Sequence, residues 1–159
     1  MNAETETYSR YIRKQIDSIL AIAGTLNEDQ LNRRPPLAVG NSVFVIATHV
    51  LGNAQAWVLG VACGQPVRRD RPSEFASSGS FDVLKSASEE VSGAIEAALA
   101  TLEPGALDQR LVPPQELWGE GEPYEISVRT ALADVLEHAS IHLGQVQLTR
   151  DLVLGETST

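Results

Sequence analysis

Three histidines are the residues best suited to carry chemistry in this chain. His138 and His142 are four residues apart in a helical pattern, so their side chains project from one helix face on successive turns. His49 lies within a second, apolar helical segment. An imidazole that is buried without a partner costs about 1–3 kcal/mol, so three of them in one small core need a common explanation.

A shared divalent metal ion supplies that explanation, because neutral imidazole is the commonest protein ligand for such ions. Three protein nitrogens leave one coordination position open, which is typical of catalytic rather than structural sites. A donor set without thiolate suits zinc, nickel or iron. The sequence therefore predicts a metal site made of His49, His138 and His142. The alternative is that each histidine takes part in an ordinary hydrogen-bond network of the core.

Polar residues near the histidines are candidates for orienting the imidazole rings. Asn53 follows His49 by one turn, Asp134 precedes His138 by four residues, and Gln145 follows His142 by three. Each of the three either binds its histidine or simply faces water.

Two glycines, Gly52 and Gly144, lie inside the same predicted helices. Interior glycine costs about 1 kcal/mol relative to alanine, which indicates a packing or functional need. That need is either close helix packing or room for a bound ligand.

Other residues are weaker candidates. Trp57, Trp118 and Tyr124 either wall a pocket or belong to the core. The cluster 68–71 (Arg-Arg-Asp-Arg) either steers an anionic ligand or, as we expect, lies on the solvated surface. Cys63 is expected to be a structural thiol, because the C-terminal end of a helix lacks the positive dipole that lowers a thiol pKa.

Four segments with helical periodicity must position these residues: 4–26, 41–63 with Asn41 as N-cap, 81–102 after Ser80, and 127–154. Residues 27–31 are typical of a short capped turn, 68–79 of a loop, and 103–126 of a long connection that serves as a lid or binding loop. No segment predicts a strand. We therefore expect an all-α fold, a four-helix bundle with a crossover connection, formed by a single domain over residues 1–154 and followed by a C-terminal tail, 155–159.

Composition narrows the function classes. The 159 residues carry a net charge of −9, which argues against nucleic acid and against an anionic membrane surface. The single cysteine excludes an intrachain disulfide. The N-terminus carries acidic residues, whereas a signal peptide begins with basic ones. The longest apolar stretch, 56–63, is too short to cross a bilayer. We expect a cytoplasmic protein, with homodimerisation as an expectation for an apolar bundle.

Two blocks of sequence resemble the DinB-like (DinB/YfiT) superfamily. The first is 41–50 (NSVFVIATHV) with Trp57 and 64–70 (GQPVRRD), and the second is 136–151 (LEHASIHLGQVQLTRD). The resemblance implies a four-helix bundle with a crossover, and a divalent ion held by one histidine of the second helix and two of the fourth. Those positions correspond to His49, His138 and His142. Relatives include S-transferases and isomerases that use low-molecular-weight thiols such as mycothiol or bacillithiol.

Three functions remain open at this point, because a bound ion makes either a thiol or a water lose its proton more readily. The first is a metal-dependent thiol S-transferase that acts on a small electrophilic substrate. The second is a metal-dependent hydrolase, and the third is a non-enzymatic bundle that binds a metal or a ligand. Turnover that depends on a thiol would distinguish the first from the second.

Overall fold

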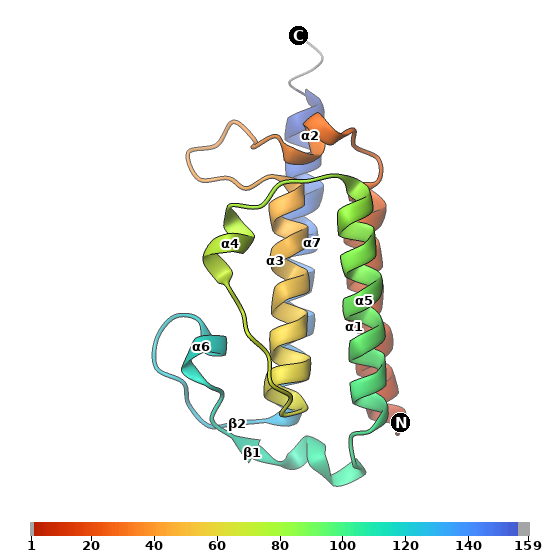
Figure 1. Ribbon diagram of the computed structural model, residues 1–159, viewed down its shortest axis with the longest axis vertical. Helices are drawn as coiled ribbons and strands as arrows, with labels where there is room; N and C mark the ends of the chain where they lie inside the picture. Colours follow the sequence, from red (N-terminus) through yellow and green to blue (C-terminus); the bar gives the residue numbers. More distant parts are fainter. Residues whose placement is uncertain (1, 156–159) are drawn as a thin grey trace.

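Four long helices form the body of the protein in the computed structural model, which describes residues 2–155 (Figure 1). They are α1 (Ala3–Ala23), α3 (Val43–Ala54) with its continuation η1 (Gln55–Ala62), α5 (Phe81–Ala100) and α7 (Val128–Gly155). Both α5 and α7 pack against α1 and α3. The predicted all-α four-helix bundle is confirmed. Gly155 ends α7, and the rest of the predicted tail, 156–159, lies outside the described residues.

The crossover is the segment between η1 and α5. Figure 1 shows α3 and α5 running in the same direction, so the chain returns along the whole length of the bundle between them. This return passes beside α3 and contains a short helix, α4 (Arg71–Phe75), which the sequence predicted as loop. Asp70 caps α4 by accepting a hydrogen bond from the Ser73 amide, and Pro72 occupies its first turn.

Capping residues explain where the helices begin. Asn2 and Thr5 form a reciprocal capping box at the start of α1, and Asn27 and Gln30 form another at α2 (Glu28–Asn32). The side chain of Ser42, not of the predicted Asn41, accepts a hydrogen bond from the Val45 amide at the start of α3. The first helix ends at Ala23, three residues earlier than expected, because the chain turns at Gly24.

The second long helix changes its winding midway. Residues Gln55–Ala62 form a π-helix, η1, where the sequence predicted continuous α-helix. Such segments are often found at functional sites. The combined helix Val43–Ala62 is long and apolar enough to span a membrane by length and composition. The expectation based on the stretch 56–63 alone underestimated the length of this apolar helix. Its most apolar window is 78% buried inside the protein, as expected for the central helix of a bundle.

The long connection 103–126 contains short elements that periodicity did not reveal. They are the 3-10 helix η2 (Pro104–Asp108), β1 (Arg110–Leu111), α6 (Gln115–Trp118) and β2 (Ile126–Ser127), which pairs antiparallel with β1. Elements of two to five residues are too short to show a period, so the expectation of no strand was wrong for four residues. This connection crosses the end of the bundle where η1 ends and α7 begins (Figure 1).

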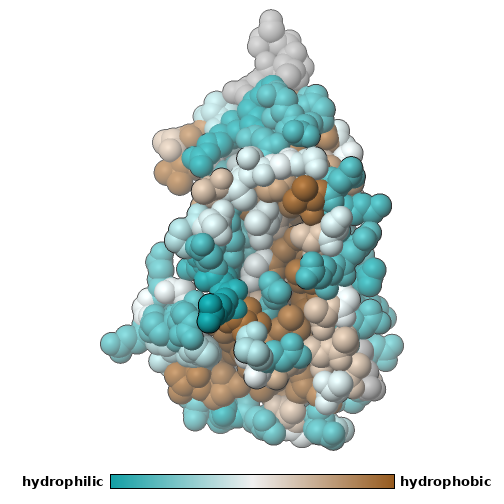
Figure 2. Space-filling view, in the orientation of Figure 1, coloured by the Kyte–Doolittle hydropathy of each residue, from teal (hydrophilic) through white to brown (hydrophobic). Residues whose placement is uncertain are grey.

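The core lies along the axis of the four helices. Its fully buried large side chains include Ile12, Ile16, Ile19, Val43, Val50, Ile95, Leu99 and Leu132. On the face shown in Figure 2, hydrophilic residues dominate the upper end, and hydrophobic residues gather in the lower half.

Candidate metal centre

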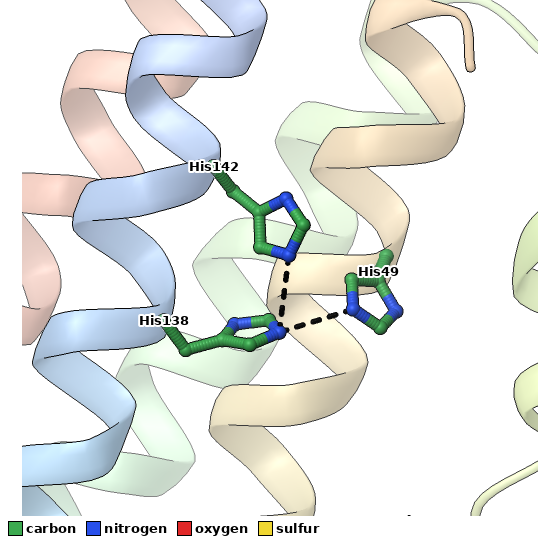
Figure 3. Close-up of side chains that lie close together, drawn as sticks. All are labelled: His49, His138 and His142. Carbon is green, nitrogen blue, oxygen red and sulfur yellow. Dashed lines mark hydrogen bonds between the residues drawn. The ribbon is translucent and has the colours of Figure 1, made fainter. Parts of the chain in front are cut away.

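The three predicted histidines lie together in the structure. His49 projects from α3, and His138 and His142 project from successive turns of α7 toward it (Figure 3). The Nε2 atom of His138 is 3.0 Å from Nε2 of His49 and 3.1 Å from Nε2 of His142. Metal–nitrogen bonds of about 2.0–2.1 Å hold two nitrogens on one ion at roughly 3.0–3.4 Å, so these separations suit a shared ion.

Burial favours the neutral form of His138 and His142. His49 is only 5% exposed, and the other two histidines are half-buried. Burial, the neighbouring histidines, and the charges of Arg69 and Arg71 lower the pKa of His138 to about 3. Burial also lowers the pKa of His142, although its hydrogen bond to Gln145 acts in the opposite direction. Neutral imidazole is the form that binds a metal ion.

A buried ion pair orients His49. The Glu74 carboxylate, on α4, accepts a hydrogen bond from His49 Nδ1 at 2.8 Å. Arg69 donates to both oxygens of the same carboxylate, from Nε at 2.7 Å and from Nη2 at 3.0 Å. The side chains of Arg69 and Glu74 are 5% and 8% exposed. This fork-shaped, charge-assisted pairing gives the buried carboxylate the partners that it needs.

The ionisation of Glu74 determines which nitrogen of His49 carries the proton. Burial raises the pKa of Glu74, but the hydrogen bonds from His49 and Arg69 outweigh burial and hold that pKa below its ordinary value. Arg69 Nη2 also lies 3.3 Å from His49 Nδ1, but a guanidinium only donates, so the shorter contact with the carboxylate is decisive. His49 therefore carries its proton on Nδ1 and directs the Nε2 lone pair toward the other histidines.

Gln145 performs the same task for His142. Its side-chain oxygen accepts a hydrogen bond from His142 Nδ1 at 2.6 Å, so the Nε2 lone pair of His142 also faces the cluster. Gln145 was one of three candidates for this role. Asn53 and Asp134 form no hydrogen bond with a histidine among the described residues, and they line the adjacent cavity.

His138 cannot satisfy both of its nitrogens with the groups around it. Its Nδ1 is buried without a hydrogen-bond partner among the described residues, and its Nε2 faces two lone pairs. One proton on Nε2 serves only one of these acceptors well, and a proton on Nδ1 makes three lone pairs converge. A cation at the point of convergence accepts all three lone pairs, so the residues present fit a divalent metal ion.

Gly52 makes room for the carboxylate. A Cβ atom at this position would lie 2.3 Å from Oε1 and 2.9 Å from Cδ of Glu74. The glycine at position 52 is thus explained, because it leaves room for the Glu74 carboxylate beside His49. A Cβ atom at Gly144 would have no other atom within 4 Å among the described residues, so nothing in the structure explains a glycine there.

A cavity of about 330 Å³ opens beside the triad. His49 and His138 form part of its wall, and the predicted wall residues Trp57 and Trp118 lie 5.7 Å apart between ring centres. Tyr124 packs edge-on against Trp118 and is 64% exposed, outside this lining. The remaining lining residues are Asn53, Arg69, Arg71, Gly119, Glu120 and Asp134. The connection 103–126 therefore contributes to a cavity, as expected of a binding loop.

Sequence reasoning missed Glu74 altogether and placed Arg69 on the solvated surface, which was wrong. Both lie in a polar, turn-rich segment where no periodicity indicates burial. The available signal was Gly52, because a glycine one turn from a candidate ligand indicates that another group occupies the space.

Replacing Gly52 with alanine should destabilise the protein. The new methyl group displaces the Glu74 carboxylate, and the lost charged hydrogen bonds, about 1.5–3 kcal/mol, outweigh a helix-propensity gain of about 1 kcal/mol. Gly144→Ala is the matched control and should stabilise by about 0.5–1 kcal/mol, because its site is open. Urea unfolding measures both changes. An equal gain in stability for the two variants would contradict the tight fit at Gly52.

Cys63 should react slowly with iodoacetamide near neutral pH. It is partly buried at the end of η1, and burial raises the pKa of its thiol to about 11. The thiolate is the reacting form, so the rate should rise about tenfold per pH unit until the pH nears that value. The urea-unfolded chain is the control, and its rate should level off above about pH 8.5. A folded-state rate that already levels off near neutral pH would be inconsistent with a structural thiol.

Comparison with known proteins agrees with the fold. The model of the mycothiol-S-transferase family matches residues 7–155. A conserved protein from Enterococcus faecalis has a similar crystal structure, with 16% identity, a TM-score of 0.70, and coverage of 98% of this chain and 99% of the other.

A mutant of the mycothiol-dependent maleylpyruvate isomerase is also similar, with 14% identity and a TM-score of 0.66. That match covers 89% of this chain and 60% of the isomerase. None of the curated proteins matches the chain significantly. Because the family model spans nearly the whole bundle, the chain belongs to the mycothiol-S-transferase family, within the DinB-like superfamily that its sequence resembles.

Proposed function

We propose that His49, His138 and His142 bind one divalent metal ion and that the protein transfers a low-molecular-weight thiol to a small electrophile. The observation that carries the proposal is the convergence of the three histidines, each of which offers one ring nitrogen within 4.8 Å of the other two. The family supports a thiol of the mycothiol type as co-substrate. Zinc, nickel and iron all suit three imidazole ligands.

The metal ion would supply Lewis acidity that favours the deprotonated, nucleophilic form of the thiol near neutral pH. Three neutral imidazoles add no negative charge to the site, so they leave that acidity undiminished. Glu74 and Gln145 hold two of the rings with their lone pairs directed inward. Trp57 and Trp118 form an apolar part of the cavity wall, beside which the electrophile would approach the thiol.

Metal content tests the site directly. Protein purified without an affinity tag should contain a stoichiometric first-row metal by elemental analysis, and His49→Ala and His142→Ala should each lose it, because two imidazoles bind far more weakly than three. Thr48→Ala is the control on the same helix, since its hydroxyl bonds only the Phe44 carbonyl. Circular dichroism verifies that each variant is folded. Equal trace metal in all four proteins would refute the site.

Turnover tests the activity. The metal-loaded protein should accelerate the reaction of mycothiol with a fluorogenic alkylating electrophile beyond the uncatalysed rate, and His49→Ala should abolish the acceleration. Hydrolysis of an activated ester without any thiol would instead indicate a metal-dependent hydrolase. Stoichiometric metal without turnover in either assay would contradict an enzymatic role and leave a metal-binding bundle.

A further inference from the structure

The cavity beside the triad contains one arginine that is already paired and one that is not. Arg69 is paired through Nε and Nη2 with the Glu74 carboxylate behind His49. Arg71 is half-buried in the lining of the same cavity, and it has no carboxylate within ion-pair distance among the described residues. A guanidinium presents its donors in a planar fork that matches a carboxylate, so a half-buried, unpaired arginine is suited to receive one from a ligand.

Gly119 holds a place for the Arg71 side chain. A Cβ atom at Gly119 would lie 2.8 Å from Nη1 of Arg71, so any larger residue would displace the guanidinium. Gly119 also has φ of +102°, a conformation that residues with side chains rarely adopt. Both the limited space beside Arg71 and the backbone conformation therefore favour glycine at position 119.

The rest of the lining narrows the chemistry of the ligand. Trp57 and Trp118, whose ring planes are tilted by 36°, contribute aromatic, apolar surface to the wall. Asp134 is half-buried in the lining without a hydrogen-bond or ion-pair partner among the described residues, and Glu120 adds a second, exposed acid. Unpaired acids disfavour a ligand with several negative charges, and the Asp134 carboxyl can accept a hydrogen bond from a donor such as a hydroxyl.

We propose that this cavity binds a small, flat monocarboxylate that also bears a hydroxyl or amino donor, with Arg71 as the anchor of its carboxylate. Binding of the carboxylate at Arg71 does not require the proposed function. Only the identity of the ligand rests on that function: we assign the carboxylate to the electrophilic co-substrate that meets the thiol at the triad. Arg71 is thus a specificity residue, because it selects electrophiles with an anionic group.

Tryptophan fluorescence tests the proposal without turnover. The chain contains two tryptophans, and both line this cavity, so their emission reports its occupancy. Para-hydroxybenzoate and the neutral para-hydroxybenzamide form a pair of probes that differ in the carboxylate alone. The wild-type protein should bind the carboxylate at least about tenfold more tightly, which is the effect expected of one charged hydrogen-bonded pair.

Two arginine variants locate the source of this preference. Arg71→Gln should abolish it, whereas Arg68→Gln, which removes an equal charge from an exposed residue outside the lining, should preserve it. Equal binding of both probes to the wild type, or a preference that survives in Arg71→Gln, would overturn the proposal. A preference that disappears after treatment with a chelator but not in Arg71→Gln would assign the carboxylate to the metal and would also overturn it.

Because binding is read separately from metal content and turnover, failure of this proposal is distinguishable from failure of the proposed function. A protein that transfers thiol but binds both probes equally rejects only the role of Arg71. A protein that prefers the carboxylate through Arg71 but lacks metal or turnover rejects only the transferase.

Discussion

The buried carboxylate of Glu74 is the constraint on which the geometry of the site depends. A carboxylate removed from water is stable only when its oxygens are fully paired, and removal of one partner from such a buried pair typically costs about 3–5 kcal/mol. Here the partners are the fork of Arg69 and the Nδ1–H of His49. The hydrogen bonds to this carboxylate therefore hold the Arg69 guanidinium behind the triad, and they direct the Nε2 lone pair of His49 toward the other two histidines.

The topology of the bundle and the construction of the site are linked through the two long connections. Because α3 and α5 run in the same direction, the chain must return along α3, and this return delivers Arg69, Arg71 and Glu74 to the face that carries His49 (Figure 1). The second connection, between α5 and α7, delivers Trp118 and Gly119. The helices thus supply the candidate metal ligands, and the connections supply their orientation and the far wall of the cavity.

Much of this arrangement was predictable because it is periodic. The four helices and the pairing of His138 with His142 follow from the 3.6-residue repeat. Spacing also suggested Gln145, but equally Asn53 and Asp134, which bond no histidine among the described residues. Glu74 and Arg69 were not predictable in the same way, since their burial results from a tertiary contact across 25 and 20 residues of sequence with His49. The π-helical winding of η1 was also hidden, because Gln55–Ala62 is as apolar as the α-helix before it, and its glycine, Gly60, lies well inside the segment rather than at the junction.

The distribution of charge around the cavity follows from these contacts. Neutral imidazoles leave the charge of a bound divalent ion uncompensated, and the nearest acid behind them, Glu74, is already neutralised by Arg69. Burial, which is the largest effect, and the charge of Glu137 both raise the pKa of Asp134, so the one half-buried acid of the lining is also less readily ionised than an exposed one. Arg71, in the same lining, has no ion-pair partner among the described residues. With the proposed ion bound, such a cavity would favour both a thiolate and a carboxylate, which is the combination that the proposed thiol transfer to an anionic electrophile requires.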